Sequence, residues 1–157
     1  MKVAIISGSK SDENVIYEAK KTLEEFGIEY KVYIASAHRS PEYVKEIVQK
    51  VNSEFDCIIA IAGLSAALPG FVASYSTLPV VGVPVDSEMF GLDALLSITQ
   101  MPKGVPVASM GIGKKGAHNA ALFVVRIFAN QDETLKQKLL EYIKKEEENI
   151  RKINEEL

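Results

Sequence analysis

Two residues suited to acid–base chemistry on an anion, His38 and Arg39, are adjacent in the segment Ser36-Ala37-His38-Arg39-Ser40-Pro41. Arginine binds phosphate or carboxylate with a planar fork of N–H groups, and histidine is the side chain that most readily exchanges a proton near neutral pH. His38 could also be a structural histidine. Because the chain has only two histidines and this one adjoins Arg39, we favour proton transfer on an anionic substrate.

A second polar segment, Gly8-Ser9-Lys10-Ser11-Asp12, combines a glycine with two hydroxyls and precedes a stretch with helical periodicity. Glycine lets the backbone approach a ligand, and the free amides at a helix N-terminus attract anions. The segment therefore predicts a phosphate site. The alternative is that Ser11 or Asp12 only caps the helix.

A third segment, 63–70, is uncharged and contains glycine at both ends, so we expect it to form a pocket wall close to a flat ligand. Residues 63–67 approach the nucleophile-elbow pattern of serine hydrolases, but the last glycine of that pattern is Ala67 here. No acid followed by a histidine completes a triad downstream, which excludes that class.

The elements that must position these segments are visible in the hydrophobic pattern. Five apolar runs of strand length, at 3–7, 30–36, 57–63, 80–84 and 105–111, alternate with helical segments at 12–26, from Pro41 onward, and at 66–74, 92–99 and 117–129. This alternation predicts an α/β fold, a doubly wound parallel sheet with helices on both faces. Since ligands bind at the carboxyl ends of such strands, the three segments should meet at one edge.

The C-terminal stretch, 132–157, predicts one long amphipathic helix. Its apolar residues fall near helical spacing, at Leu135, Leu139, Ile143, Ile150, Ile153 and Leu157. No further strand follows that it could cover. The apolar stripe therefore packs either on a neighbouring subunit or, as a plain solvated helix, on its own sheet.

Composition limits the remaining possibilities. The 157 residues, 47% hydrophobic and 25% charged, predict one folded domain over 1–157 that needs no disulfides. A net charge of −3 argues against nucleic acid and anionic membranes as partners. The single cysteine, Cys57, lies in an apolar run, and no His, Asp and Glu cluster has metal-ligand spacing. Without a signal peptide or membrane span, we expect a cytoplasmic protein.

The segment 111–116 reads Gly-Ile-Gly-Lys-Lys-Gly and matches the dinucleotide fingerprint after a predicted strand. That fingerprint also needs a second strand carrying an acid for the ribose, and only helix is predicted beyond Ala117. We therefore expect a glycine-rich turn into a helix that could lend amides or Asn119 to a site, with His118 at the helix start.

Taken in order, the motifs resemble those of the carboxyaminoimidazole ribonucleotide mutases and the related aminoimidazole ribonucleotide carboxylases of purine biosynthesis. The resemblance spans nearly the whole chain and rests on segments 8–12, 36–41, 68–70, 82–85, 91–93, 100–102 and 119–121. It implies a flavodoxin-like three-layer sheet with a long C-terminal helix and a homo-octamer in which these helices reach neighbouring subunits. It also implies a ribonucleotide substrate and no cofactor: no ATP, biotin or metal.

The resemblance assigns roles to residues of this chain. His38 matches the general acid that helps release carbon dioxide and the general base that later removes the ring proton. The substrate-binding set is Ser9, Ser11, Asp12, Ser36, Ala37, Arg39, Ala62, Gly63, Ser65 and Leu68. Within it, Arg39 and the Ser9 loop would bind phosphate and Asp12 the ribose hydroxyls. The base pocket would be walled against water by Ser36, Ala62, Gly63, Ser65 and Leu68.

The subclass is ambiguous in one loop. Mutases commonly have a histidine before the Leu-Pro-Gly of the third segment, and this chain has Ala67, as in the Ser-Asn-Ala-Leu loop of carboxylases. Carboxylases, however, tend to have lysine after the catalytic histidine and an arginine in the later Met-Pro segment, where this chain has Arg39 and Gln100-Met101-Pro102. We therefore predict a mutase; the alternatives are a carboxylase and, more distantly, a flavodoxin-like phosphoribosyl or flavin binding module.

Overall fold

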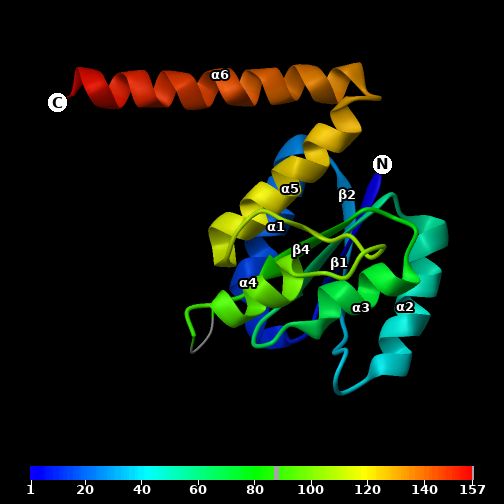
Figure 1. Cartoon of the computed structure of the whole chain (residues 1–157). Coiled ribbons are helices and arrows are strands. Elements are labelled where there is room, and N and C mark those ends of the chain that lie inside the picture. Colours follow the sequence, from blue (N-terminus) through cyan, green and yellow to red (C-terminus); the bar gives the residue numbers. More distant parts are fainter. Residues whose placement is uncertain (87–88, 157) are drawn as a thin grey trace.

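The computed structural model, which describes residues 1–86 and 89–156, contains a five-stranded parallel sheet (Figure 1). Its strands are β1 (Lys2–Ser7), β2 (Glu29–Ile34), β3 (Cys57–Ala62), β4 (Val80–Pro84) and β5 (Ala108–Ser109), in the spatial order β2-β1-β3-β4-β5. This is the flavodoxin-like strand order, and it confirms the predicted fold class.

The burial of the strands follows from their position in the sheet. Every residue of β3 and β4 is buried, as is all of β1 after Lys2, because helices cover both faces of these central strands. Cys57 is among them, and burial raises the pKa of its thiol to about 12. The edge strand β2 contains only partly buried and exposed residues.

The last strand is much shorter than the predicted run 105–111. Only Ala108 and Ser109 pair with β4. Pro106 has no N–H to donate to a neighbouring strand, and Gly104 adopts a left-handed φ of 98°. The chain therefore pairs with β4 only from Ala108 onward. The prediction of a full strand here was wrong.

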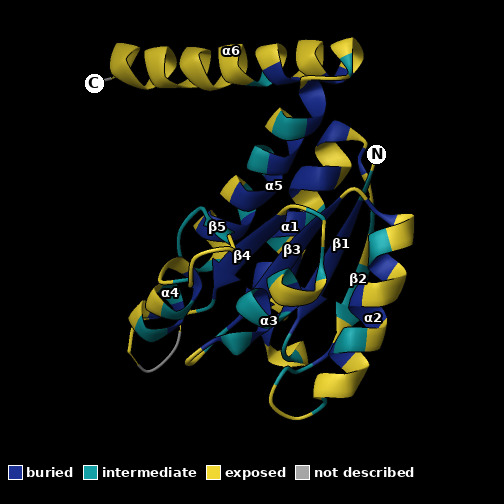
Figure 2. Cartoon of the chain, turned by 45° about the vertical axis from the view of Figure 1, so that its right-hand side comes forward, coloured by how far each residue is buried: buried dark blue, intermediate teal, exposed yellow. Residues whose placement is uncertain are grey.

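Two layers of helices enclose the sheet (Figure 2). Helices α1 (Glu13–Phe26) and α5 (Gly113–Ala129) pack on one face, in a core that includes Leu23, Ile59 and Val124. Helices α2 (Pro41–Glu54), α3 (Ala67–Tyr75) and α4 (Leu92–Thr99) pack on the other. A short 3-10 helix, η1 (Lys10–Asp12), precedes α1.

Helix ends agree with the sequence signals in part. Helix α2 begins at Pro41, as predicted, and Gly27 ends α1 with a left-handed φ of 72°. The side chain of Ser40, however, does not cap α2. Its hydroxyl donates instead to the carbonyl of Ser36, which closes the turn between β2 and α2.

Helix α5 begins four residues before the predicted 117–129, so the last residues of the glycine-rich segment are helical rather than a turn. Gly111 and Gly113 have φ values of 109° and 66°, which L-residues rarely adopt. A Cβ on Gly116 would lie 1.8 Å from the carbonyl oxygen of Gly111. The three glycines are therefore explained by backbone geometry and close packing alone.

The long helix α6 (Glu133–Glu155) confirms the predicted amphipathic helix; Leu157 lies outside the described residues. The Asp132 side chain caps it by accepting from the amide of Leu135. Only Leu135 and Leu139 are buried, and every residue from Ile143 to Glu156 is exposed. Figure 1 shows the helix extending away from the rest of the molecule.

A hydrogen-bonded histidine joins α6 to the molecule. Thr22 donates its hydroxyl proton to the carbonyl of Glu18, so it accepts from Nδ1 of His118 at 2.8 Å. Nε2 of the same ring lies within hydrogen-bond distance, 3.1 Å, of the Tyr142 hydroxyl. His118 thus links α1, α5 and α6. No helix in the described ranges combines the length and apolar character needed to cross a bilayer.

Candidate active site

Backbone hydrogen bonds hold the three predicted segments together at the carboxyl edge of the sheet. The amide of Gly8 donates to the carbonyl of Ile61, which fixes the first loop to the end of β3. The amide of Ala35 donates to the carbonyl of Ser7, which fixes the second loop to β1. The relative positions of the loops therefore follow directly from the strand order β2-β1-β3.

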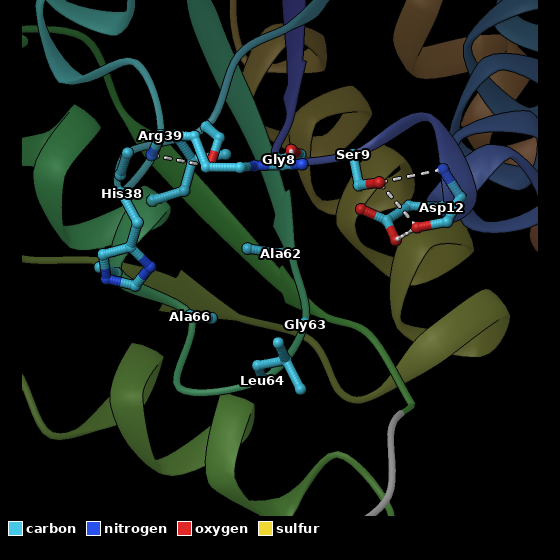
Figure 3. Close-up of a pocket in the computed structure, with 14 residues that line it drawn as sticks. Gly8, Ser9, Asp12, His38, Arg39, Ala62, Gly63, Leu64 and Ala66 are labelled. Atoms are coloured by element: carbon cyan, nitrogen blue, oxygen red, sulfur yellow. Dashed lines mark hydrogen bonds between the residues drawn. The ribbon is translucent and has the colours of Figure 1, made fainter.

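A cavity of about 500 Å³ lies between these loops (Figure 3). Ten of the eleven predicted site residues line it: Ser9, Ser11, Asp12, Ser36, Ala37, His38, Arg39, Ala62, Gly63 and Leu68. The eleventh, Ser65, is exposed and lies outside the lining. Four residues that were not predicted complete it: Gly8, Leu64, Ala66 and Ala67.

The first loop carries a network of hydroxyls around a buried carboxylate. Asp12 is only 9% exposed and accepts from the hydroxyl of Ser7 at 2.9 Å and from that of Ser11 at 3.2 Å. The Ser11 hydroxyl also lies 2.8 Å from that of Ser9. Asp12 does not cap α1 with its side chain. Its carboxylate is therefore fixed in the cavity wall, with capacity left to accept from a ligand.

The second loop carries the arginine and the histidine, both exposed at the cavity. Nη2 of Arg39 donates to the carbonyl of Gly8 at 2.8 Å, a bond that joins the second loop to the first. The remaining N–H groups of the guanidinium are available for an anion. In the described part of the chain His38 forms no hydrogen bond, so both ring nitrogens are free to exchange a proton with a ligand.

The third loop forms an apolar wall. Ala62, Ala66 and Leu68 are buried there, and Ala67 faces the cavity without a polar group. Leu64, also in the lining, has a left-handed φ of 55°. A residue with this φ is usually glycine, so the residue type of Leu64 did not predict this conformation.

The cavity thus has a polar part, with Ser9, Asp12 and Arg39, and an apolar part formed by 62–68. Hydroxyls, a carboxylate and a guanidinium suit a sugar phosphate. An apolar wall beside a histidine suits proton transfer away from bulk water. Within 1–86 and 89–156, no group of three His, Cys, Asp or Glu side chains is placed to hold a metal ion.

A second cavity, of about 420 Å³, adjoins the first and shares Ser11 and Asp12 with it. Gly113, Lys114 and Lys115 line this cavity. The glycine-rich segment therefore lies near the site, as predicted. Asn119 lines neither of the two cavities.

Comparison with known proteins agrees with this geometry. The family model described as "AIR carboxylase" matches residues 2–149. The N5-carboxyaminoimidazole ribonucleotide mutase of Methanocaldococcus jannaschii is 51% identical over 148 residues, which cover 94% of this chain and 92% of the relative. The mutase of Brucella melitensis is 45% identical, with 94% and 93% of the two chains covered.

A solved structure extends the agreement to the fold. The crystal structure of Treponema denticola PurE superposes with a TM-score of 0.90 at 31% identity, covering 99% of this chain and 98% of that one. Motif order, strand order and sequence identity all point to the same group of enzymes. The chain therefore belongs to the AIR carboxylase family.

Proposed function

We propose that the protein is an N5-carboxyaminoimidazole ribonucleotide mutase, an isomerase of purine biosynthesis. It would convert N5-carboxyaminoimidazole ribonucleotide to 4-carboxyaminoimidazole ribonucleotide by moving one carboxyl group. The observation that carries the proposal is a single cavity that joins a polar part with Ser9, Asp12 and Arg39, a histidine and an apolar wall. Relatives that are 45–51% identical over nearly the whole chain have this name.

The polar part of the cavity would bind the ribose phosphate. Arg39 and the loop around Ser9 would bind the phosphate, since among the described residues of the lining Arg39 is the one arginine or lysine. Asp12 would accept hydrogen bonds from the ribose hydroxyls. Ser11, Ser36 and the backbone of Ala37 lie next to these groups and would complete the contacts.

His38 would move the proton that the reaction requires. As an acid it would protonate N5 while the N5–C bond breaks, so that the bond's electron pair remains on nitrogen and carbon dioxide is released. The C4 atom of the imidazole would then attack the same carbon dioxide. His38, now neutral, would remove the C4 proton and restore the aromatic ring, which leaves the enzyme in its starting protonation state.

The apolar wall would keep the released carbon dioxide from water. Ala62, Gly63 and Leu68 present no charged group to the cavity, so carbon dioxide there would find no nucleophile other than the imidazole carbon. Ser65, which the resemblance placed in this wall, is exposed and lies outside the cavity lining, so the proposal does not depend on it.

A direct aminoimidazole ribonucleotide carboxylase is the second candidate, because Ala67 lines the cavity where mutases commonly have a histidine. Two other features favour the mutase: Arg39, which directly follows His38, and the segment Gln100-Met101-Pro102. A flavodoxin-like binding module remains the distant alternative, to be adopted if neither ribonucleotide is turned over.

We further propose that the chain assembles as a homo-octamer through α6. The helix exposes Leu140, Ile143, Ile150 and Ile153, which its own chain does not cover. A second copy would bury this stripe. Sedimentation of the purified protein tests the stoichiometry, and the expected cytoplasmic location stays a prediction.

The test of the proposed activity compares two substrates. Purified protein receives either the N5-carboxyamino ribonucleotide without bicarbonate, or aminoimidazole ribonucleotide with a low concentration of bicarbonate. Rapid turnover of only the first supports the mutase. Efficient turnover of the second supports the carboxylase, and activity with neither would contradict both.

The role of His38 needs its own variant. His38→Asn should fold and bind the ribonucleotide with little change, because the ring forms no hydrogen bond in the described chain, but it should lose turnover. Ser53→Ala, on the exposed surface of α2 and outside the cavity lining, is the control and should retain the wild-type rate. Unchanged turnover in the asparagine variant would remove His38 from the mechanism.

A further inference from the structure

One cavity residue, Leu64, combines two unusual features. Its φ of 55° lies in the left-handed region, where a side chain other than glycine is strained. The residue is also 67% exposed, although it is a leucine in the lining of a cavity. Strain of this kind persists only where the surrounding structure enforces it, and it is frequent at ligand sites.

The surrounding loop accounts for how the conformation is held. The amide of Ala66 donates to the carbonyl of Leu64 at 2.7 Å, which closes a tight turn directly after Leu64. On the other side, a Cβ on Gly63 would lie 3.4 Å from the side chain of Val85, so the chain passes close to the residue that follows β4. The left-handed residue lies between these two constraints, and its side chain is directed away from the buried core.

Leu64 differs in this respect from its neighbours in the apolar wall. Ala62, Ala66 and Leu68 are buried and already packed. Leu64 is the large apolar side chain of the cavity lining that remains mostly in solvent, so it has apolar surface left to bury on a ligand. In Figure 3 it lies by Gly63 and Ala66, away from Ser9 and Asp12.

The proposed reaction creates a need that this side chain can meet. Carbon dioxide is small, uncharged and apolar, and once it reaches water it is hydrated to bicarbonate. The ribose phosphate would cover the polar part around Ser9 and Arg39, which leaves the side of His38 and Leu64 as the open exit. Both of these residues are exposed in the described structure.

We infer that Leu64 is an apolar cap that closes over the reacting end of the bound ribonucleotide and retains carbon dioxide between the two halves of the reaction. The inference rests on the proposed decarboxylation and recarboxylation. Leu64 exchanges no proton and forms no bond in it. It acts by lengthening the time for which carbon dioxide stays beside C4, so its loss changes the fate of carbon dioxide and not the chemistry at His38.

The test measures how the substrate is partitioned. Wild type and variants receive the N5-carboxyamino ribonucleotide in bicarbonate-free buffer, and the rearranged product and released aminoimidazole ribonucleotide are both quantified after subtraction of spontaneous decarboxylation. In Leu64→Ala we expect the ratio of released to rearranged product to rise about tenfold, which equals a change of about 1.4 kcal/mol between the two barriers.

Two further substitutions separate the side chain from the backbone. Leu64→Gly relieves the left-handed strain but removes the cap. Its ratio of released to rearranged product should therefore equal that of the alanine variant. Leu64→Met keeps a flexible apolar side chain and should restore partitioning close to that of wild type. If this ratio is as high in the methionine variant as in the alanine variant, the loop geometry and not the apolar side chain controls the partitioning, and the inference is wrong.

Phe90→Ala is the matched control, because Phe90 also has a left-handed φ, of 56°, and is 85% exposed but does not line the cavity. Its partitioning should equal that of wild type. Failure of the wild type to turn over the substrate would overturn the proposed function. Turnover by the wild type with unchanged partitioning in the alanine and glycine variants would overturn the cap alone.

Discussion

The assignment of Arg39 to the phosphate leads to a quantitative expectation. One N–H of its guanidinium is already used, because Nη2 donates to the carbonyl of Gly8 at 2.8 Å. This bond holds the fork at the cavity while the other donors stay available. Arg39→Ala removes the donors and the charge together, so the ribonucleotide should bind more weakly.

The size of the loss follows from the kind of contact. A hydrogen bond to a charged group contributes about 1.5–3 kcal/mol, which corresponds to about 10-fold to about 150-fold in Kd. Because Arg39 is exposed, solvent screens its contact with the phosphate, and we expect the lower end of this range. The free energy of unfolding should change by less than about 0.5 kcal/mol, as for most exposed positions.

Calorimetric titration with aminoimidazole ribonucleotide measures this Kd directly, and steady-state kinetics should show the same change in KM. Arg39→Lys retains the charge but neither the planar fork nor the bond to Gly8, so its affinity should lie between those of wild type and the alanine variant. Lys114→Ala, in the second cavity, is the control. If Arg39→Ala binds like wild type and Lys114→Ala does not, the phosphate lies in the second cavity and the reasoning is refuted.

Three further expectations concern packing, pH and subclass. Gly116→Ala should lower the free energy of unfolding by about 2 kcal/mol in a denaturant titration. The added Cβ would lie 1.8 Å from the Gly111 carbonyl oxygen, and this clash outweighs the gain in helix propensity. A stabilised variant would contradict this packing. Burial and a hydrogen bond to Glu24 raise the pKa of Tyr30 to about 12, so its contribution to stability should be complete below pH 10 and be lost as the pH rises towards 12. Spectrophotometric titration of wild type and of Tyr30→Phe checks that direction, and a Tyr30 that ionises near pH 10 would disprove it. Ala67→His should shift the ratio of mutase to carboxylase turnover towards the mutase, and an unchanged ratio would show that this position does not decide the subclass.

Much of the fold could be predicted because its determinants are local. Continuous apolar runs such as 57–62 identify strands buried on both faces, and Gly27 and Pro41 mark helix ends through their own backbone preferences. The strand over 105–111 was wrong because its apolar residues satisfied the pattern while Pro106 limited the pairing. A hydrophobic pattern reports burial, but it does not report which amides reach a partner.

The site was predictable to the extent that topology alone positions it. Ser9, Arg39 and Gly63 follow three adjacent strands, so the rule for parallel sheets places them together. The orientation of side chains within a loop has no such rule. Ser65 was predicted to contact the substrate and its neighbour Leu64 was not, yet of the two only Leu64 lines the cavity. Leu64 is also the residue with a left-handed φ, which its residue type does not favour.

Some side chains of the site are held by hydrogen bonds and others are not, which indicates the side chains that must adjust when a ligand binds. Asp12 is held by two hydroxyls and Arg39 by the Gly8 carbonyl, so the groups proposed to bind ribose phosphate are in place before the ligand arrives. Binding there costs little ordering of side chains. His38 and Leu64, in contrast, are exposed, and the His38 ring forms no hydrogen bond within the described residues. Adjustment on binding is therefore concentrated in the acid–base residue and the cap, which lie where carbon dioxide would be released and must be retained.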